Sequence, residues 1–264
     1  VSEGKFPKLL GASGLLSHAD RDLLVQGGVE AVTLSNNHTR DFGDAGLRDT
    51  EAALAEYGVA GIPGNQGQCF ELRHDNGDTL RLGAYVHPFN GSAKQMEDGC
   101  KRLRDEGADI LVAFMHTGAE KTYIPTKRQT ALAHAAVKGG ADVVVGTHPH
   151  VLQPIEVYQG SVILYSIGNF CFGGNKNPSD KDCMIVQQTF TVRGNDVTID
   201  NTNVIHCVRH RRGPLVGDVL YPLLHQQRLQ PERLPAHPLP AGYGGLPALF
   251  SEAGRYLPAP GAQA

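Results

Sequence analysis

The chain has 264 residues, of which 41% are hydrophobic and 19% are charged. This composition is typical of a globular rather than a disordered protein, and the length allows a substantial buried core. The net charge of −3 at pH 7 argues against nucleic acid as a partner, because nucleic-acid-binding domains usually carry a basic excess. The five cysteines are scattered without a C-x-x-C pair, so neither a disulfide framework nor a cysteine zinc site is expected.

No apolar run approaches the roughly 20 residues that a membrane-spanning helix needs, and no signal peptide is visible. The chain begins at Val1 rather than at a methionine, so we expect that the start of the gene product is missing. The localisation of the protein therefore stays unknown at this point.

Residues 1–212 alternate short β-rich runs with amphipathic helical stretches, which predicts one layered α/β (α+β) sandwich domain. The predicted strands, in chain order, are 30–35, 80–86, 109–116, 142–146, 161–170, 184–192 and 196–208. The predicted helices are 44–58, 94–107 and 126–140. In the first helix Leu47, Thr50, Leu54 and Tyr57 share one face at a period of 3.6 and are expected to be buried. The segment "GNQGQ" (64–68) lacks the strand–loop–helix setting of a phosphate-binding loop and is interpreted as a turn.

Residues 213–264 differ in composition from the rest of the chain, because more than half of the 16 prolines lie there among many glycines. Such a segment cannot form one continuous helix. We predict an irregular C-terminal tail that wraps on the domain or links it to another element.

Polar side chains follow three of the predicted strands, where α/β folds place their ligand sites. A single histidine after a strand is more often structural than a ligand. Three strands that all end in this way change that expectation, because their ends would converge on one rim of the sheet. Imidazole nitrogens and an amide oxygen suit a borderline divalent metal such as zinc, manganese or iron. In chain order the clusters are Asn36, Asn37, His38 and Asp41; His116 and Glu120; and His148 and His150, on either side of Pro149.

Three segments of the sequence resemble the successive signature blocks of CapA-type proteins. They are "LSNNHTRDFGDAGLRDTEAAL", "HTGAEKTYIPTKRQ" and "GADVVVGTHPHVLQPIEVYQGSVILYSIGNF". CapA-type proteins are poly-γ-glutamate capsule synthesis proteins, related to the calcineurin-like metallophosphatases. The resemblance covers roughly residues 5–195 and implies a metallophosphatase-like domain with a metal site at its strand ends.

The resemblance also implies a role for each residue of the three clusters. One divalent ion (zinc, manganese, iron or calcium) would be the cofactor. Its ligands would be Asn37, His116 and His148, with His150 reaching a second metal position. The catalytic group would be His38 as acid or transition-state donor, Asp41 holding the His38 loop, and Glu120 facing the site behind the ligands or against substrate. Asn169 would orient the histidine loop.

The sequence departs from this family in two places. The acidic G-D and N-L-E blocks that normally precede the N-N-H block, and supply metal-bridging carboxylates, are not in the chain. We therefore expect an N-terminally incomplete domain with an exposed sheet edge, able to hold one metal but not a stable two-metal hydrolytic site. Thr117 stands where the family usually has tryptophan, which removes an aromatic wall from the site.

These observations leave three functions open. The leading one is a metal-dependent, hydrolase-like enzyme that acts on a peptide or poly-γ-glutamate substrate. The second is a peptide-modifying amino-acid epimerase of natural-product biosynthesis, since the same metal and acid–base parts could abstract an α-proton. The third is a non-catalytic binding subunit with capsule-assembly partners. The oligomeric state is not predicted.

Overall fold

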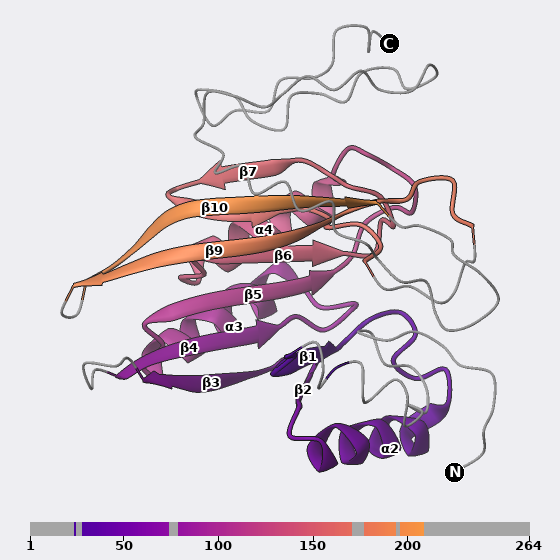
Figure 1. Ribbon diagram of the computed structural model, residues 1–264, viewed down its shortest axis with the longest axis horizontal. Helices are drawn as coiled ribbons and strands as arrows, with labels where there is room; N and C mark the ends of the chain where they lie inside the picture. The colour runs from indigo at the N-terminus through magenta and orange to yellow at the C-terminus, as the bar shows by residue number, and fades with distance from the viewer. Residues whose placement is uncertain (1–23, 25–27, 74–78, 171–176, 194–195, 209–264) are drawn as a thin grey trace, which may run out of the picture.

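The computed structural model describes residue 24 and residues 28–73, 79–170, 177–193 and 196–208 (Figure 1). The predicted tail over 213–264 lies outside these residues. The described elements combine helices with three β-sheets, so the predicted mixed α/β class is confirmed.

Among the described residues, the largest sheet has six strands in the order β3-β4-β5-β6-β8-β7. Strands β4, β5, β6 and β8 run parallel, while the edge strands β3 and β7 pair antiparallel to their neighbours. The apolar runs "ILVAFMH" and "VVVGT" form the two central strands, as expected for strands covered on both faces. The bounds are β3 (Gln66–Arg73), β4 (Thr79–Val86), β5 (Ile110–His116), β6 (Val143–Thr147), β7 (Ile155–Tyr158) and β8 (Ser161–Leu164).

Helices α3 (Ala93–Asp105) and α4 (Lys127–Lys138) cover one face of this sheet, behind it in Figure 1. Each begins with a capping box, formed by Ser92 with Gln95 and by Thr126 with Gln129. In a capping box two backbone N–H groups that lack partners within the helix are satisfied reciprocally. Both helix starts are therefore fixed locally by sequence.

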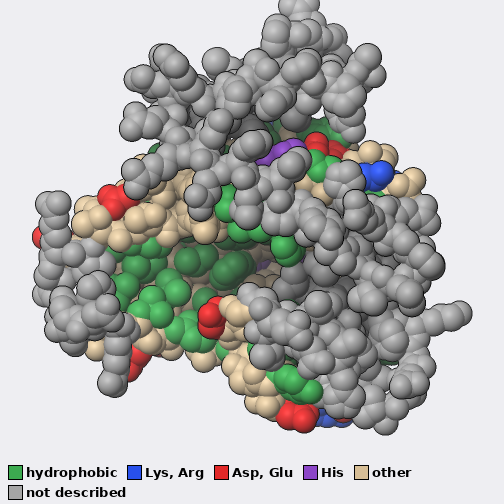
Figure 2. Space-filling view, in the orientation of Figure 1, with side chains coloured by type: hydrophobic (Ala, Val, Ile, Leu, Met, Phe, Trp, Pro, Cys, Tyr) green, Lys and Arg blue, Asp and Glu red, His purple; other side chains and the backbone are tan. Residues whose placement is uncertain are grey.

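Two smaller sheets lie against the opposite face of the large sheet. Strands β1 (Ala31–Leu34) and β2 (Ala60–Pro63) pair in parallel, connected through helix α2 (Gly43–Glu56). Strands β9 (Asp182–Arg193) and β10 (Asp196–Val208) form a long antiparallel hairpin that crosses in front of the sheet in Figure 1. Apolar clusters join each small sheet to the large one. Figure 2 shows hydrophobic side chains in a hollow of this face, below the hairpin.

The structure corrects several sequence predictions. Strands β2, β3 and β7 were not predicted, and the turn predicted over 64–68 is limited to Gly64 and Asn65, because Gln66 begins β3. The strand predicted over 161–170 ends at Leu164. The other predicted helices and strands are present, with ends that differ by a few residues. Within the described ranges, no helix is both long and apolar enough to cross a membrane.

Candidate metal centre

The three polar clusters meet at one end of the large sheet. Strand β5 ends at His116, which pairs in register with Thr147 at the end of β6. His148 therefore follows directly beside His116, and their ring centroids lie 4.8 Å apart. Asn37 arrives from the loop after β1, with its Oδ1 3.0 Å from His116 Nε2. The predicted convergence of strand ends is confirmed.

The His148–Pro149–His150 turn has an unusual backbone. His148 has a φ of 99° and His150 a φ of 60°, values at which L-residues are uncommon and strained. The two imidazoles lie on the same side of the turn, with ring centroids 6.0 Å apart. Strain of this kind concentrates at functional sites, where the surrounding structure maintains it.

His116 is held from both sides of its ring. Thr147 Oγ1 lies 2.8 Å from His116 Nδ1, while His148 Nδ1 lies 3.2 Å from His116 Nε2. The amide oxygen of Asn37 approaches the same Nε2 atom. Three groups that all carry lone pairs thus face one another, an arrangement that a shared proton or a cation would stabilise.

Glu120, His148 and His150 form a second grouping that shares His148 with the first. One potential ligand atom of each lies within 4.8 Å of those of the other two. Two imidazoles and one carboxylate are a donor set that suits iron, zinc or manganese. The three side chains therefore fit a divalent ion by chemistry as well as by proximity.

The protonation of His148 agrees with such a role. Burial lowers its pKa below the ordinary 6.5, and the nearby His150 lowers that pKa further. The Glu120 carboxylate acts in the opposite direction, and His38 contributes a smaller decrease. A lowered pKa keeps the imidazole neutral at pH 7, the form that can donate a lone pair to a metal.

His38 and Asp41 form an exposed pair beside this centre. His38 Nδ1 lies 2.8 Å from Asp41 Oδ2, and the backbone N–H of His38 donates to Asn36 Oδ1 at 2.7 Å. A carboxylate on Nδ1 fixes the tautomer and leaves Nε2 available for proton transfer. The pair can thus present a proton donor or acceptor at the rim.

Asn169 contacts the histidine turn, which it was expected to orient. Its side-chain nitrogen donates to the His150 carbonyl oxygen at 3.2 Å, and its Oδ1 lies 2.8 Å from His150 Nδ1. These contacts orient both the backbone and the ring of His150. The other predicted site residues lie where the clusters meet.

Phe89 was missed by the sequence analysis. It lies in the loop after β4, and its ring centroid is 5.9 Å from those of both His116 and His148. An aromatic wall is therefore present, although Thr117 replaces the tryptophan expected of the family. No sequence signal marks Phe89, because an apolar residue in a loop has no spacing that links it to a distant histidine.

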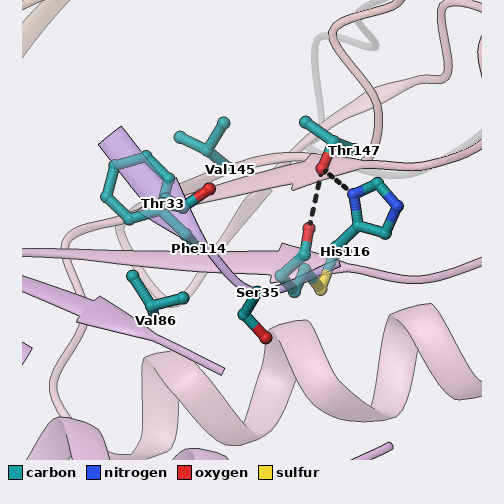
Figure 3. A pocket seen from close by; sticks show the side chains of 8 residues that line it. Thr33, Ser35, Val86, Phe114, His116, Val145 and Thr147 are labelled. Atoms are coloured by element: carbon teal, nitrogen blue, oxygen red, sulfur yellow. Dashed lines mark hydrogen bonds between the residues drawn. The ribbon is translucent and has the colours of Figure 1, made fainter. Parts of the chain in front are cut away.

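A small cavity of about 30 Å³ lies beneath His116, between β1 and the large sheet (Figure 3). The predicted site residue in its wall is His116, whose ring is bonded to Thr147 there. The other walls are largely apolar. They are formed by Thr33, Ser35, Val86, Phe114, Met115 and Val145.

The protein is thus a mixed α/β domain that gathers histidines and a carboxylate at the ends of its strands. Residues 17–174 match the family described as "Bacterial capsule synthesis protein PGA_cap". The chain belongs to this family, as its motifs suggested.

Curated relatives agree with this assignment. The chain is 32% identical over 196 residues to "Capsule biosynthesis protein CapA" of Bacillus anthracis, covering 66% of this chain and 47% of that protein. It is 33% identical over 183 residues to "PGA biosynthesis protein CapA" of Bacillus subtilis (strain 168), covering 58% and 48%. It is 28% identical over 165 residues to "Probable polyglutamine synthesis accessory protein Rv0574c" of Mycobacterium tuberculosis, covering 52% and 43%. The chain thus spans about half the length of the curated relatives it matches.

Proposed function

We propose that this chain is a metal-dependent enzyme of capsule synthesis that acts on a peptide or poly-γ-glutamate chain. The observation that carries the proposal is the convergence of Glu120, His148 and His150, whose ligand atoms lie within 4.8 Å of one another. These three residues would hold one divalent ion, with Asn37 and His116 completing the centre. The names of the relatives support the choice of a glutamate polymer as substrate.

A divalent ion at this place would polarise a substrate carbonyl oxygen as a Lewis acid. His38 would donate or accept the proton at the same face, with its tautomer fixed by Asp41. Phe89 would limit water around His116 and His148, which strengthens electrostatic interactions inside the site. The same parts serve hydrolysis and α-proton abstraction, so the two reactions are distinguished by their products.

The test of the metal site is metal content by mass spectrometry, on the chain and on a His148→Ala, His150→Ala double variant. We expect near-stoichiometric metal in the parent protein and its loss in the double variant. His134→Ala is the matched control, because His134 is a partly buried histidine of α4 that pairs with Glu156. Metal missing from the parent, or retained by the double variant, would overturn the proposal.

The reaction is tested by incubating the metal-loaded protein with poly-γ-glutamate and with short peptides in D₂O. Cleavage fragments identify a hydrolase. Deuterium at an α-carbon without cleavage identifies an epimerase, the alternative in which His38, paired with Asp41, would abstract the α-proton. A bound polymer that is neither cleaved nor labelled identifies a binding subunit with capsule-assembly partners, and contradicts the enzymatic proposal.

A further inference from the structure

Glu120 lies on the loop between β5 and α4, and its side chain is exposed. An exposed glutamate has many rotamers and a mobile backbone unless its loop is anchored. Hydrogen bonds from neighbouring elements are therefore needed to hold the Glu120 loop beside the His148–Pro149–His150 turn. The first anchor is direct: the backbone N–H of Lys121 donates to the Pro149 carbonyl oxygen at 2.7 Å.

The second anchor is a buried pair of side-chain amides. Gln153 Nε2 donates to the Thr122 carbonyl oxygen at 2.7 Å, two residues after Glu120. Gln129 Nε2 in turn donates to Gln153 Oε1 at 2.6 Å. Gln129 is 0% exposed and Gln153 is 1% exposed. The loop is thus tied to the interior of the domain through two amides in series.

The direction of both amides is determined by backbone groups at the two ends of the series. Gln129 Oε1 accepts from the Thr126 backbone N–H at 2.9 Å, because Gln129 belongs to the capping box of α4. Its Nε2 must therefore face Gln153, whose own Nε2 then faces the Thr122 carbonyl oxygen. Amide orientation usually has to be assigned from such a network, and here it has one consistent solution.

The loop also closes tightly over Gln129. Gly118 has a φ of 130°, and a Cβ atom at that position would lie 2.7 Å from the Gln129 amide carbon. A buried amide without partners destabilises a protein, whereas a fully bonded network makes its surroundings rigid. The pair therefore fixes the loop rather than only filling space.

We infer that Gln153, supported by Gln129, is a positioning residue that holds Glu120 against His148 and His150. The inference rests on the proposed metal site and deepens it. Groups behind the ligands of metal sites commonly change metal affinity roughly 10- to 100-fold when they are removed. Gln153 would act in this way through the backbone of Thr122, without touching the ion.

The experiment is a double-mutant cycle on zinc affinity, measured by titration calorimetry with zinc alone. Gln153→Met keeps the length of the side chain and removes its hydrogen bonds to the Thr122 carbonyl oxygen and to Gln129 Nε2. We expect it to weaken zinc binding roughly 10- to 100-fold, and to have no further effect in a Glu120→Gln background. Gln66→Met, an exposed position of the edge strand β3, is the control and is expected to bind zinc like the parent.

An equal loss of affinity with and without Glu120 would overturn the inference, since Gln153 would then act through the fold as a whole. Unchanged affinity in Gln153→Met would overturn it while leaving the proposed metal site intact. If the parent protein binds no zinc, the titration is repeated with manganese and with iron(II). Binding of none of the three ions would overturn the metal site itself, and the inference with it. If Gln153→Met does not fold, Gln129→Met is put through the same cycle.

Discussion

Replacing His148 by glycine is expected to give a more stable metal-free protein than replacing it by alanine. Both changes remove the imidazole and its contacts, so their comparison isolates the backbone. His148 has a φ of 99°, in the region where a Cβ atom clashes with the backbone and glycine does not. At most other positions glycine would be the less stable choice.

The expected difference follows from two opposing effects. A left-handed backbone costs an L-residue about 1–2 kcal/mol, and this cost disappears with glycine. Glycine also increases the conformational entropy of the unfolded chain, which costs about 0.4–1 kcal/mol. From the middle of each range, the net preference for glycine at His148 is about 0.8 kcal/mol. His150, with a φ of 60°, is closer to the left-handed minimum near about +57°, so its preference is expected to be smaller.

The assay is urea unfolding in the presence of EDTA, with the free energy of unfolding compared between the alanine and glycine variants. The same pair at His134, in the middle of α4, is the control. Glycine is expected to be about 1 kcal/mol less stable there. If His148→Ala is as stable as His148→Gly, the turn is not strained and the reasoning is refuted.

Three further outcomes are expected. Burial lowers the pKa of His87 and that of His148 below 6.5. The unfolded chain therefore takes up protons first as the pH falls, and metal-free protein should lose stability from pH 7 to pH 5 in urea unfolding. The hydrogen bond to Asp182 raises the pKa of His206 and acts in the opposite direction, so the measurement uses a His206→Gln background. Stability that is flat over this range would contradict the burial of these rings. Gly146→Ala would place a Cβ atom 2.1 Å from the Tyr165 carbonyl oxygen, and should destabilise the protein by about 3 kcal/mol; a loss well below 1 kcal/mol would argue against this packing. Phe89→Ala should raise the pKa of His148 in an NMR titration by exposing its ring, and Phe89→Leu should change it less; an unchanged titration in both variants would show that Phe89 does not shield the site.

The fold was predictable where hydrophobic runs are long. The strands that the sequence did not predict are short or rich in polar residues. Strand β3 is an edge strand with glutamines at Gln66 and Gln68, and β7 has only four residues. Edge strands are less buried than central strands and carry fewer apolar side chains. The apolar pattern that predicts a strand from sequence is therefore weak in them.

The sequence was enough to predict which residue types form the site and that they lie at the ends of strands. The histidines follow apolar runs. The register of β5 with β6 pairs His116 with Thr147 and so places His148 beside His116. What could not be predicted depends on distances between segments far apart in sequence. Gln129 and Gln153 look like ordinary polar residues of a helix and a loop, and only the folded chain brings their amides to 2.6 Å.

Strands β1 and β2, with helix α2, form a unit with its own small cluster of buried side chains, among them Val32, Leu34 and Leu54. His38 and Asn37 belong to this unit, whereas Glu120 and the histidine turn belong to the large sheet. Small units with few buried contacts open more often than the main core. Hydrogen exchange should therefore show the β1–α2–β2 amides opening first, so that on warming the protein would lose its proton-transfer pair and Asn37 before it releases an ion held by Glu120, His148 and His150.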